Sequence, residues 1–121
     1  EAQGAVPPSH IEFLASLPLY YQTAGLLFVH AGIRPGIAIV DQVEDDLMWI
    51  RDGFLDHTGS FGHLVIHGHT MVHQVDYRSN RLNIDTGAGR GDDLSAVVIE
   101  DGQVYLLSPQ GRTLLRPAGR T

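Results

Sequence analysis

The chain has 121 residues, 43% of them hydrophobic and 18% charged, which suits one globular domain with a moderate core. It has no cysteine, so disulfides and thiolate metal sites are excluded, and any metal must be held by His, Asp, Glu or Asn. A net charge of −6 argues against a nucleic-acid partner. No apolar run approaches the ~18 residues of a membrane span and nothing resembles a signal peptide, so we expect a cytoplasmic protein with no membrane contact.

The first half of the sequence predicts two helices around one strand. A helix is expected over residues 9–17, where apolar side chains share one face and Pro18 ends the pattern. Four apolar residues at 26–29 predict a strand buried on both faces, followed by a glycine-containing loop over 30–36. A second helix is expected from 41 to about 54, beginning with capping-box spacing.

The second half changes to short strands, and its turn residues indicate hairpins. Ser79-Asn80 separates two of these strands, and Asp101-Gly102, a strong hairpin signal, separates another two. We therefore expect an α/β protein with two helices and a mainly antiparallel sheet, the second half forming an antiparallel meander. The strands are expected at 64–66, 75–77, 81–84, 95–100 and 103–107.

Two histidines follow apolar strands, each beside a glycine turn. His30 comes directly after the strand at 26–29, and His69 follows the one at 64–66. Open α/β sheets bind ligands at the carboxyl ends of their strands, and imidazoles held there make good metal ligands. Sequence spacing alone does not make them ligands, so a structural role or plain exposure stays open for each. We interpret His67 as a packing residue, or one that supports a ligand, rather than as a ligand itself.

Two further residues, Arg51 and Asp85, each have a functional interpretation and a purely structural one. Arg51 follows the apolar positions of the second helix, where a guanidinium could bind a phosphate through two N–H donors. The alternative is a solvated side chain paired with Asp46 or Asp52. Asp85 closes a strand, and its carboxylate could orient a ligand histidine or simply accept amides of its own turn.

Four segments, taken in order, resemble one protein family. They are FVHAGIRP at 28–35, DLMWIR at 46–51, VIHGHT at 65–70 and NIDTGA at 83–88. Together they resemble the C-terminal half of bacterial serine/threonine phosphoprotein phosphatases, which are calcineurin-like metallophosphoesterases. The resemblance extends from about residue 7 to residue 107. Each segment is modestly specific, and the four in order are highly specific.

The resemblance implies a dinuclear metal site and a phosphatase activity. By it, His30 and His69 are ligands of the second metal, and Arg51 is both catalytic and phosphate-binding. Family members use two divalent ions, commonly manganese, or iron with zinc, to activate a water that attacks phosphorus. The expected substrate is a phosphoprotein carrying phosphoserine or phosphothreonine, or a small phosphoester. Symmetrical cleavage of diadenosine tetraphosphate is the alternative within the family.

The family's upstream motifs, Gly-Asp-x-His-Gly, Gly-Asp-x-x-Asp-Arg-Gly and Gly-Asn-His-Glu or -Asp, do not occur in this chain. We therefore expect residues 1–121 to be the C-terminal part of a single metallophosphoesterase domain, half of a four-layer αββα sandwich, whose partner is the missing N-terminal half. The chain alone is expected to be inactive. A rival interpretation makes it a non-catalytic metal-binding or interaction fragment. Uncovered apolar faces would also favour self-association.

Overall fold

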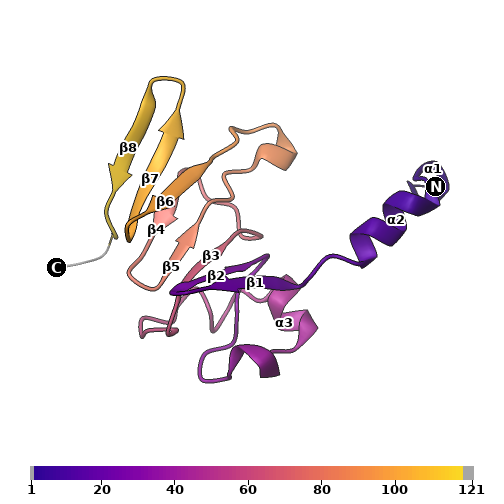
Figure 1. The fold of residues 1–121 in the computed structure, drawn as a ribbon, viewed down its shortest axis with the longest axis horizontal. Coiled ribbons are helices and arrows are strands. Elements are labelled where there is room, and N and C mark those ends of the chain that lie inside the picture. The colour runs from indigo at the N-terminus through magenta and orange to yellow at the C-terminus, as the bar shows by residue number, and fades with distance from the viewer. Residues whose placement is uncertain (1, 119–121) are drawn as a thin grey trace.

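A computed structural model describes residues 2–118, which form an α/β fold with two sheets (Figure 1). The first sheet is mixed and has five strands in the order β1-β2-β3-β5-β4. Their bounds are Tyr20–Thr23, Leu26–Val29, Leu64–His67, Asp76–Tyr77 and Arg81–Asn83 for β1 to β5. The second sheet is antiparallel, in the order β6-β7-β8. Its strands are Val97–Glu100, Gln103–Ser108 and Gly111–Leu115.

The two predicted helices are shorter than the sequence indicates: they are α2 (Pro8–Ala15) and α3 (Glu44–Trp49). A short helix that was not predicted, α1 (Ala2–Ala5), precedes them. The helix expected over 41–54 is wrong at both ends, because residues 39–41 form a separate 3-10 turn and Ile50 is extended (φ −61°, ψ 142°). The Leu47 carbonyl accepts the Ala31 N–H at 2.9 Å. In a longer helix the same Leu47 carbonyl would accept the N–H of residue 51, so the contact with Ala31 replaces the next helical hydrogen bond.

The central strand pairs are parallel, which corrects the expected antiparallel meander. β3 lies between β2 and β5 and runs parallel to both, so it belongs to the sheet of the first half. The two predicted hairpins, β4–β5 and β6–β7, are confirmed as antiparallel pairs. β1 and β8 were not predicted, because their sequences, YYQT and GRTLL, lack a clear apolar run.

Strand β2 packs on both faces, as its apolar run predicts. Leu27 and Val29 belong to a first core cluster with Leu47 of α3 and with Phe54. The alternate side chains, Leu26 and Phe28, are half-buried and pack in a second cluster that includes Val104 of β7. The second cluster joins the two sheets, while the first holds α3 and its flanking loops against the mixed sheet.

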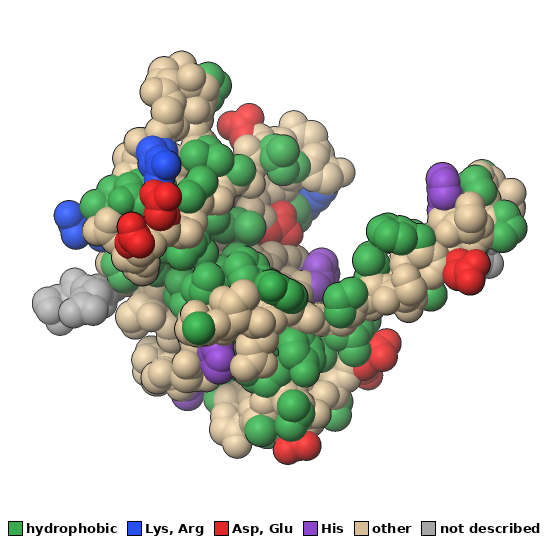
Figure 2. Space-filling view, in the orientation of Figure 1, with side chains coloured by type: hydrophobic (Ala, Val, Ile, Leu, Met, Phe, Trp, Pro, Cys, Tyr) green, Lys and Arg blue, Asp and Glu red, His purple; other side chains and the backbone are tan. Residues whose placement is uncertain are grey.

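Helix α2 stands apart from the sheets (Figure 1), and Figure 2 shows its apolar side chains reaching solvent. The predicted apolar face exists in the sequence but covers nothing among the described residues. Ile11, Leu14 and Leu17 are 44%, 60% and 47% exposed. Tyr21, the second residue of β1, is 63% exposed as well. This arm of the chain therefore presents an unusually apolar surface.

Candidate metal centre

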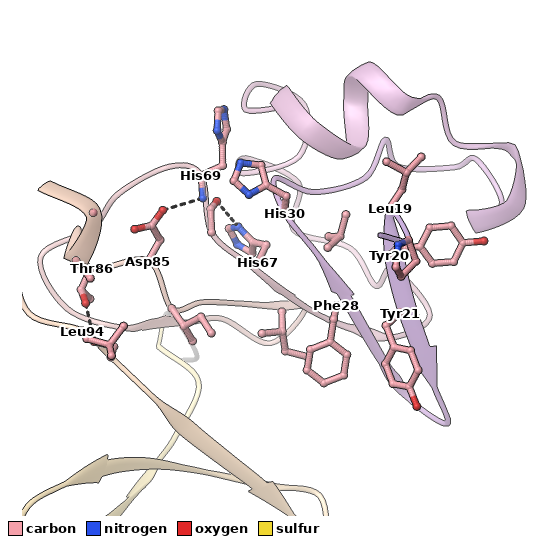
Figure 3. Close-up of a pocket in the computed structure, with 18 residues that line it drawn as sticks. Leu19, Tyr20, Tyr21, Phe28, His30, His67, His69, Asp85, Thr86 and Leu94 are labelled. Atoms are coloured by element: carbon pink, nitrogen blue, oxygen red, sulfur yellow. Dashed lines mark hydrogen bonds between the residues drawn. The ribbon is translucent and has the colours of Figure 1, made fainter. Parts of the chain in front are cut away.

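His30 and His69 meet at one edge of the mixed sheet, although 38 residues separate them in the chain. His30 is the first residue after β2, and His69 lies two residues beyond β3. Because β2 and β3 are parallel neighbours, their carboxyl ends come together. The two ring centroids lie 5.2 Å apart, with the planes tilted by 57°. Figure 3 shows both rings at the rim of a cavity of about 630 Å³.

The peptide of Gly68 ties the two histidine loops together. Its N–H donates to the His30 carbonyl at 2.8 Å. The next residue, His69, has a φ of +70°, and its backbone N–H donates to Asp85 Oδ2 at 2.9 Å. A Cβ at position 68 would lie 3.1 Å from Asp85 Cβ, so glycine allows this close approach. The position of His69 is thus set by two loops at once.

Asp85 supports His69 through the backbone rather than through the imidazole. Its Oδ2 accepts the His69 N–H, and its Oδ1 accepts the Gly87 N–H at 3.1 Å. Asp85 therefore accepts an amide of its own turn, one of the two alternatives considered, and it also holds the His69 loop through the backbone.

His67 is buried, and its packing role is seen directly. It is 2% exposed, and its ring stacks edge-on against Phe54 with centroids 4.8 Å apart. Burial lowers the pKa of His67 to about 4, and the nearby Arg81 charge adds to that effect, while a hydrogen bond to Gly68 opposes it. His67 is therefore neutral at physiological pH.

Arg51 is exposed and, within residues 2–118, forms no ion pair. The alternative pairing with Asp46 is not seen, because the Asp46 carboxylate accepts two hydrogen bonds from the Arg34 guanidinium, each at 2.9 Å. Arg51 lines a neighbouring pocket together with Arg34 and Trp49. The charge of Arg51 also acts on the histidine pair. The pKa of His69 is lowered chiefly by burial, and to a smaller extent by Arg51 and His30.

The histidine pair suits two positions in the coordination shell of one ion. Zinc–nitrogen bonds of about 2.0–2.1 Å would place two imidazole centroids about 5 Å apart at a tetrahedral angle. The 5.2 Å separation fits that arrangement. Over residues 2–118 there is no group of three or more histidine or carboxylate side chains arranged to hold a metal. The described residues therefore offer two candidate ligands, and a closed site needs more.

Sequence reasoning missed three residues that shape this site. Trp49 packs edge-on against His69, with centroids 5.6 Å apart. Asn83 donates to the Thr70 carbonyl at 2.7 Å and so ties β5 to the loop after His69. Arg81 reaches the ring of His67. Polar residues alternate with apolar ones at 81–85, and that period-two pattern on a buried strand was the signal available for Arg81 and Asn83.

No known family model matches the chain, and no curated protein matches it either. Within residues 2–118 no helix is both long and apolar enough to cross a membrane.

Proposed function

We propose that this chain supplies one side of a dinuclear metal site for phosphomonoester hydrolysis, acting on phosphoserine or phosphothreonine as part of a four-layer αββα domain. The observation that supports the proposal best is the His30–His69 pair, held 5.2 Å apart at the ends of adjacent parallel strands. In this role His30 and His69 hold the second ion. Bound metal ions would supply an activated water and would neutralise charge on the phosphoryl group.

Within that site, Arg51 is the residue that would bind the substrate. Its guanidinium is exposed and unpaired among the described residues, and it lies close enough to lower the pKa of His69. Two parallel N–H donors suit the oxygens of a phosphoryl group and would stabilise the charge that develops on them. Asp85 and His67 hold the loop that presents His69, and so contribute to position rather than to chemistry.

The decisive experiment measures hydrolysis by the full natural chain that contains these residues. We expect manganese-dependent release of phosphate from a phosphoserine peptide. His30→Ala should abolish turnover by removing a metal ligand, and Arg51→Ala should lower kcat/KM by weakening phosphate binding and charge stabilisation. An exposed arginine elsewhere, Arg90→Ala, is the matched control.

Two outcomes would redirect the proposal. Preferential symmetrical cleavage of diadenosine tetraphosphate would keep the metal site and change the substrate. Metal binding without hydrolysis of either substrate would favour a non-catalytic metal-binding protein.

A further inference from the structure

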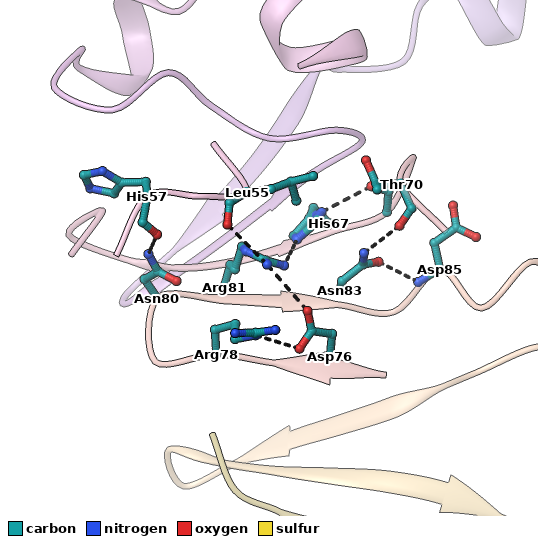
Figure 4. Close-up of polar contacts among 11 residues, drawn as sticks. Leu55, His57, His67, Thr70, Asp76, Arg78, Asn80, Arg81, Asn83 and Asp85 are labelled. Atoms are coloured by element: carbon teal, nitrogen blue, oxygen red, sulfur yellow. Dashed lines mark hydrogen bonds and ion pairs between the residues drawn. The ribbon is translucent and has the colours of Figure 1, made fainter. Parts of the chain in front are cut away.

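The ring of His67 is held between two partners of opposite hydrogen-bonding character (Figure 4). Its Nδ1 lies 3.2 Å from the Gly68 carbonyl oxygen, and its Nε2 lies 3.3 Å from Arg81 Nη1. A guanidinium can only donate, so Nε2 must be the acceptor. A carbonyl oxygen can only accept, so Nδ1 must carry the proton. Both contacts therefore select the same neutral tautomer.

Arg81 is itself fixed in place, which makes it a rigid donor. It is 6% exposed, and its Nη2 lies 3.5 Å from Asp76 Oδ2 and 3.4 Å from the Leu55 carbonyl. Asp76 belongs to β4 at the edge of the mixed sheet. The polar chain thus runs from the sheet edge through Arg81 to His67 and ends at the peptide of Gly68.

That peptide sets the course of the chain toward His69. In the Gly68–His69 peptide, the Gly68 carbonyl accepts from His67 Nδ1 and the His69 N–H donates to Asp85 Oδ2, and His69 itself lies in the left-handed region. A rotation of this peptide would lose both contacts and would redirect the His69 ring. The tautomer of His67 therefore matters to a residue that it does not touch through its side chain.

We propose that Arg81 is a positioning residue: it holds His67 in the Nδ1–H tautomer, which fixes the Gly68 carbonyl and the turn that presents His69 to His30. The inference extends the proposed function, since a ligand role for His69 rests on that function. The tautomer of His67 is independent of any metal. The positioning role of Arg81 and the ligand role of His69 can therefore be contradicted independently of each other.

Nitrogen NMR on the metal-free, histidine-labelled chain tests the tautomer directly. In the wild type, His67 should show a protonated Nδ1 and an unprotonated, acceptor-type Nε2. Arg81→Met leaves Nε2 without its donor, so the Nε2–H tautomer should appear and the amide resonances of Gly68 and His69 should shift. Arg81→Lys keeps a cationic N–H donor and should retain the wild-type pattern. Arg78→Met is the matched control, because Arg78 pairs with the same Asp76 at 2.8 Å from an exposed position.

A second pair of variants tests the role even if Arg81→Met fails to fold. His67→Asn keeps a donor for the Gly68 carbonyl, whereas His67→Leu removes it. Supporting partners of metal ligands typically contribute 10–100-fold to metal affinity, so zinc should bind His67→Leu at least about tenfold more weakly than His67→Asn. Equal affinities for the two variants would overturn the proposal, as would an Nε2–H tautomer in the wild type. Zinc failing to bind the wild type would contradict the metal site, while the tautomer result would still decide the role of Arg81.

Discussion

Asp85 holds His69 by its backbone: the His69 N–H donates to Asp85 Oδ2 at 2.9 Å, while the second carboxylate oxygen accepts from Gly87. The contact matters because His69 has a φ of +70°, a conformation that costs a residue with a Cβ about 1–2 kcal/mol. A charge-assisted hydrogen bond at that point offsets the cost. The turn that carries His69 therefore depends on a residue 16 positions later.

Asp85→Ala should lower the free energy of unfolding by about 1.5–3 kcal/mol, the usual contribution of hydrogen bonds to a charged group. Asp85→Asn keeps an acceptor oxygen and should cost less. Urea unfolding of each variant measures the difference. Asp52→Ala removes an exposed carboxylate and should stay within about 0.5 kcal/mol of the wild type. Similar losses for Asp85→Ala and Asp52→Ala would show that the contact stabilises nothing.

Metal binding by the chain alone should be weak and should need both histidines. Calorimetry with zinc or manganese should show reduced heats for His30→Ala and for His69→Ala, with His73→Ala, an exposed histidine, as the control. Imidazole binds metal only when neutral, and burial together with the Arg51 charge lowers the pKa of His69. The contribution of His69 to the affinity should therefore persist to a lower pH than that of a histidine with the ordinary pKa of about 6.5. Equal heats for His69→Ala and the wild type would exclude His69 as a ligand.

Acid should destabilise the metal-free chain through His67. The pKa of His67 is about 4 in the folded chain, chiefly because burial penalises the charged ring, against about 6.5 when unfolded. The unfolded state thus binds the proton more readily. The contribution that this pKa difference makes to the free energy of unfolding is complete above pH ~6.5. It is lost as the pH falls toward 4, a total of roughly 3 kcal/mol.

The difference in unfolding free energy between wild type and His67→Asn, measured from pH 7.5 to 4, isolates this effect. It should shrink steadily below pH 6.5, because the asparagine does not titrate. His73→Asn, at an exposed histidine, is the control. A constant difference across the whole range would mean that His67 titrates normally.

Self-association is expected because the arm around α2 presents apolar side chains to water. Phe13 and Leu14 are 63% and 60% exposed. Sedimentation should show mass above the 13.2 kDa monomer as the concentration rises. Leu14→Glu should reduce it by placing a charge on the apolar face, while Ser9→Glu on the same helix should not. A monomer at every concentration would contradict this expectation.

The 121-residue chain alone should show no hydrolysis of p-nitrophenyl phosphate above background, whichever divalent metal is added. Hydrolysis needs an activated water, a clamp on the phosphoryl oxygens and a proton for the leaving group. Within the described residues, the proposed site offers two ligands and one arginine. Turnover by the purified chain that disappears in His30→Ala would show that the site is more complete than we propose.

Local sequence determined the strands whose pattern is strong. The apolar run 26–29 became β2, and Asp101-Gly102 became the turn between β6 and β7. These signals are local, because a strand or a two-residue turn is specified by neighbouring residues. The sequence also identified His30 and His69 as strand-end residues, since their place follows from the apolar runs before them.

Tertiary structure decided what those residues contact. The parallel pairing of β2 with β3 brings the two histidines to 5.2 Å, and no local pattern specifies which strands become neighbours. The same holds for α3, which ends early because the Leu47 carbonyl is taken by Ala31, a residue 16 positions earlier. His67 and His69 lie two residues apart but differ in their surroundings. His67 is 2% exposed in a packed core, whereas His69 has a left-handed backbone conformation and lines the cavity.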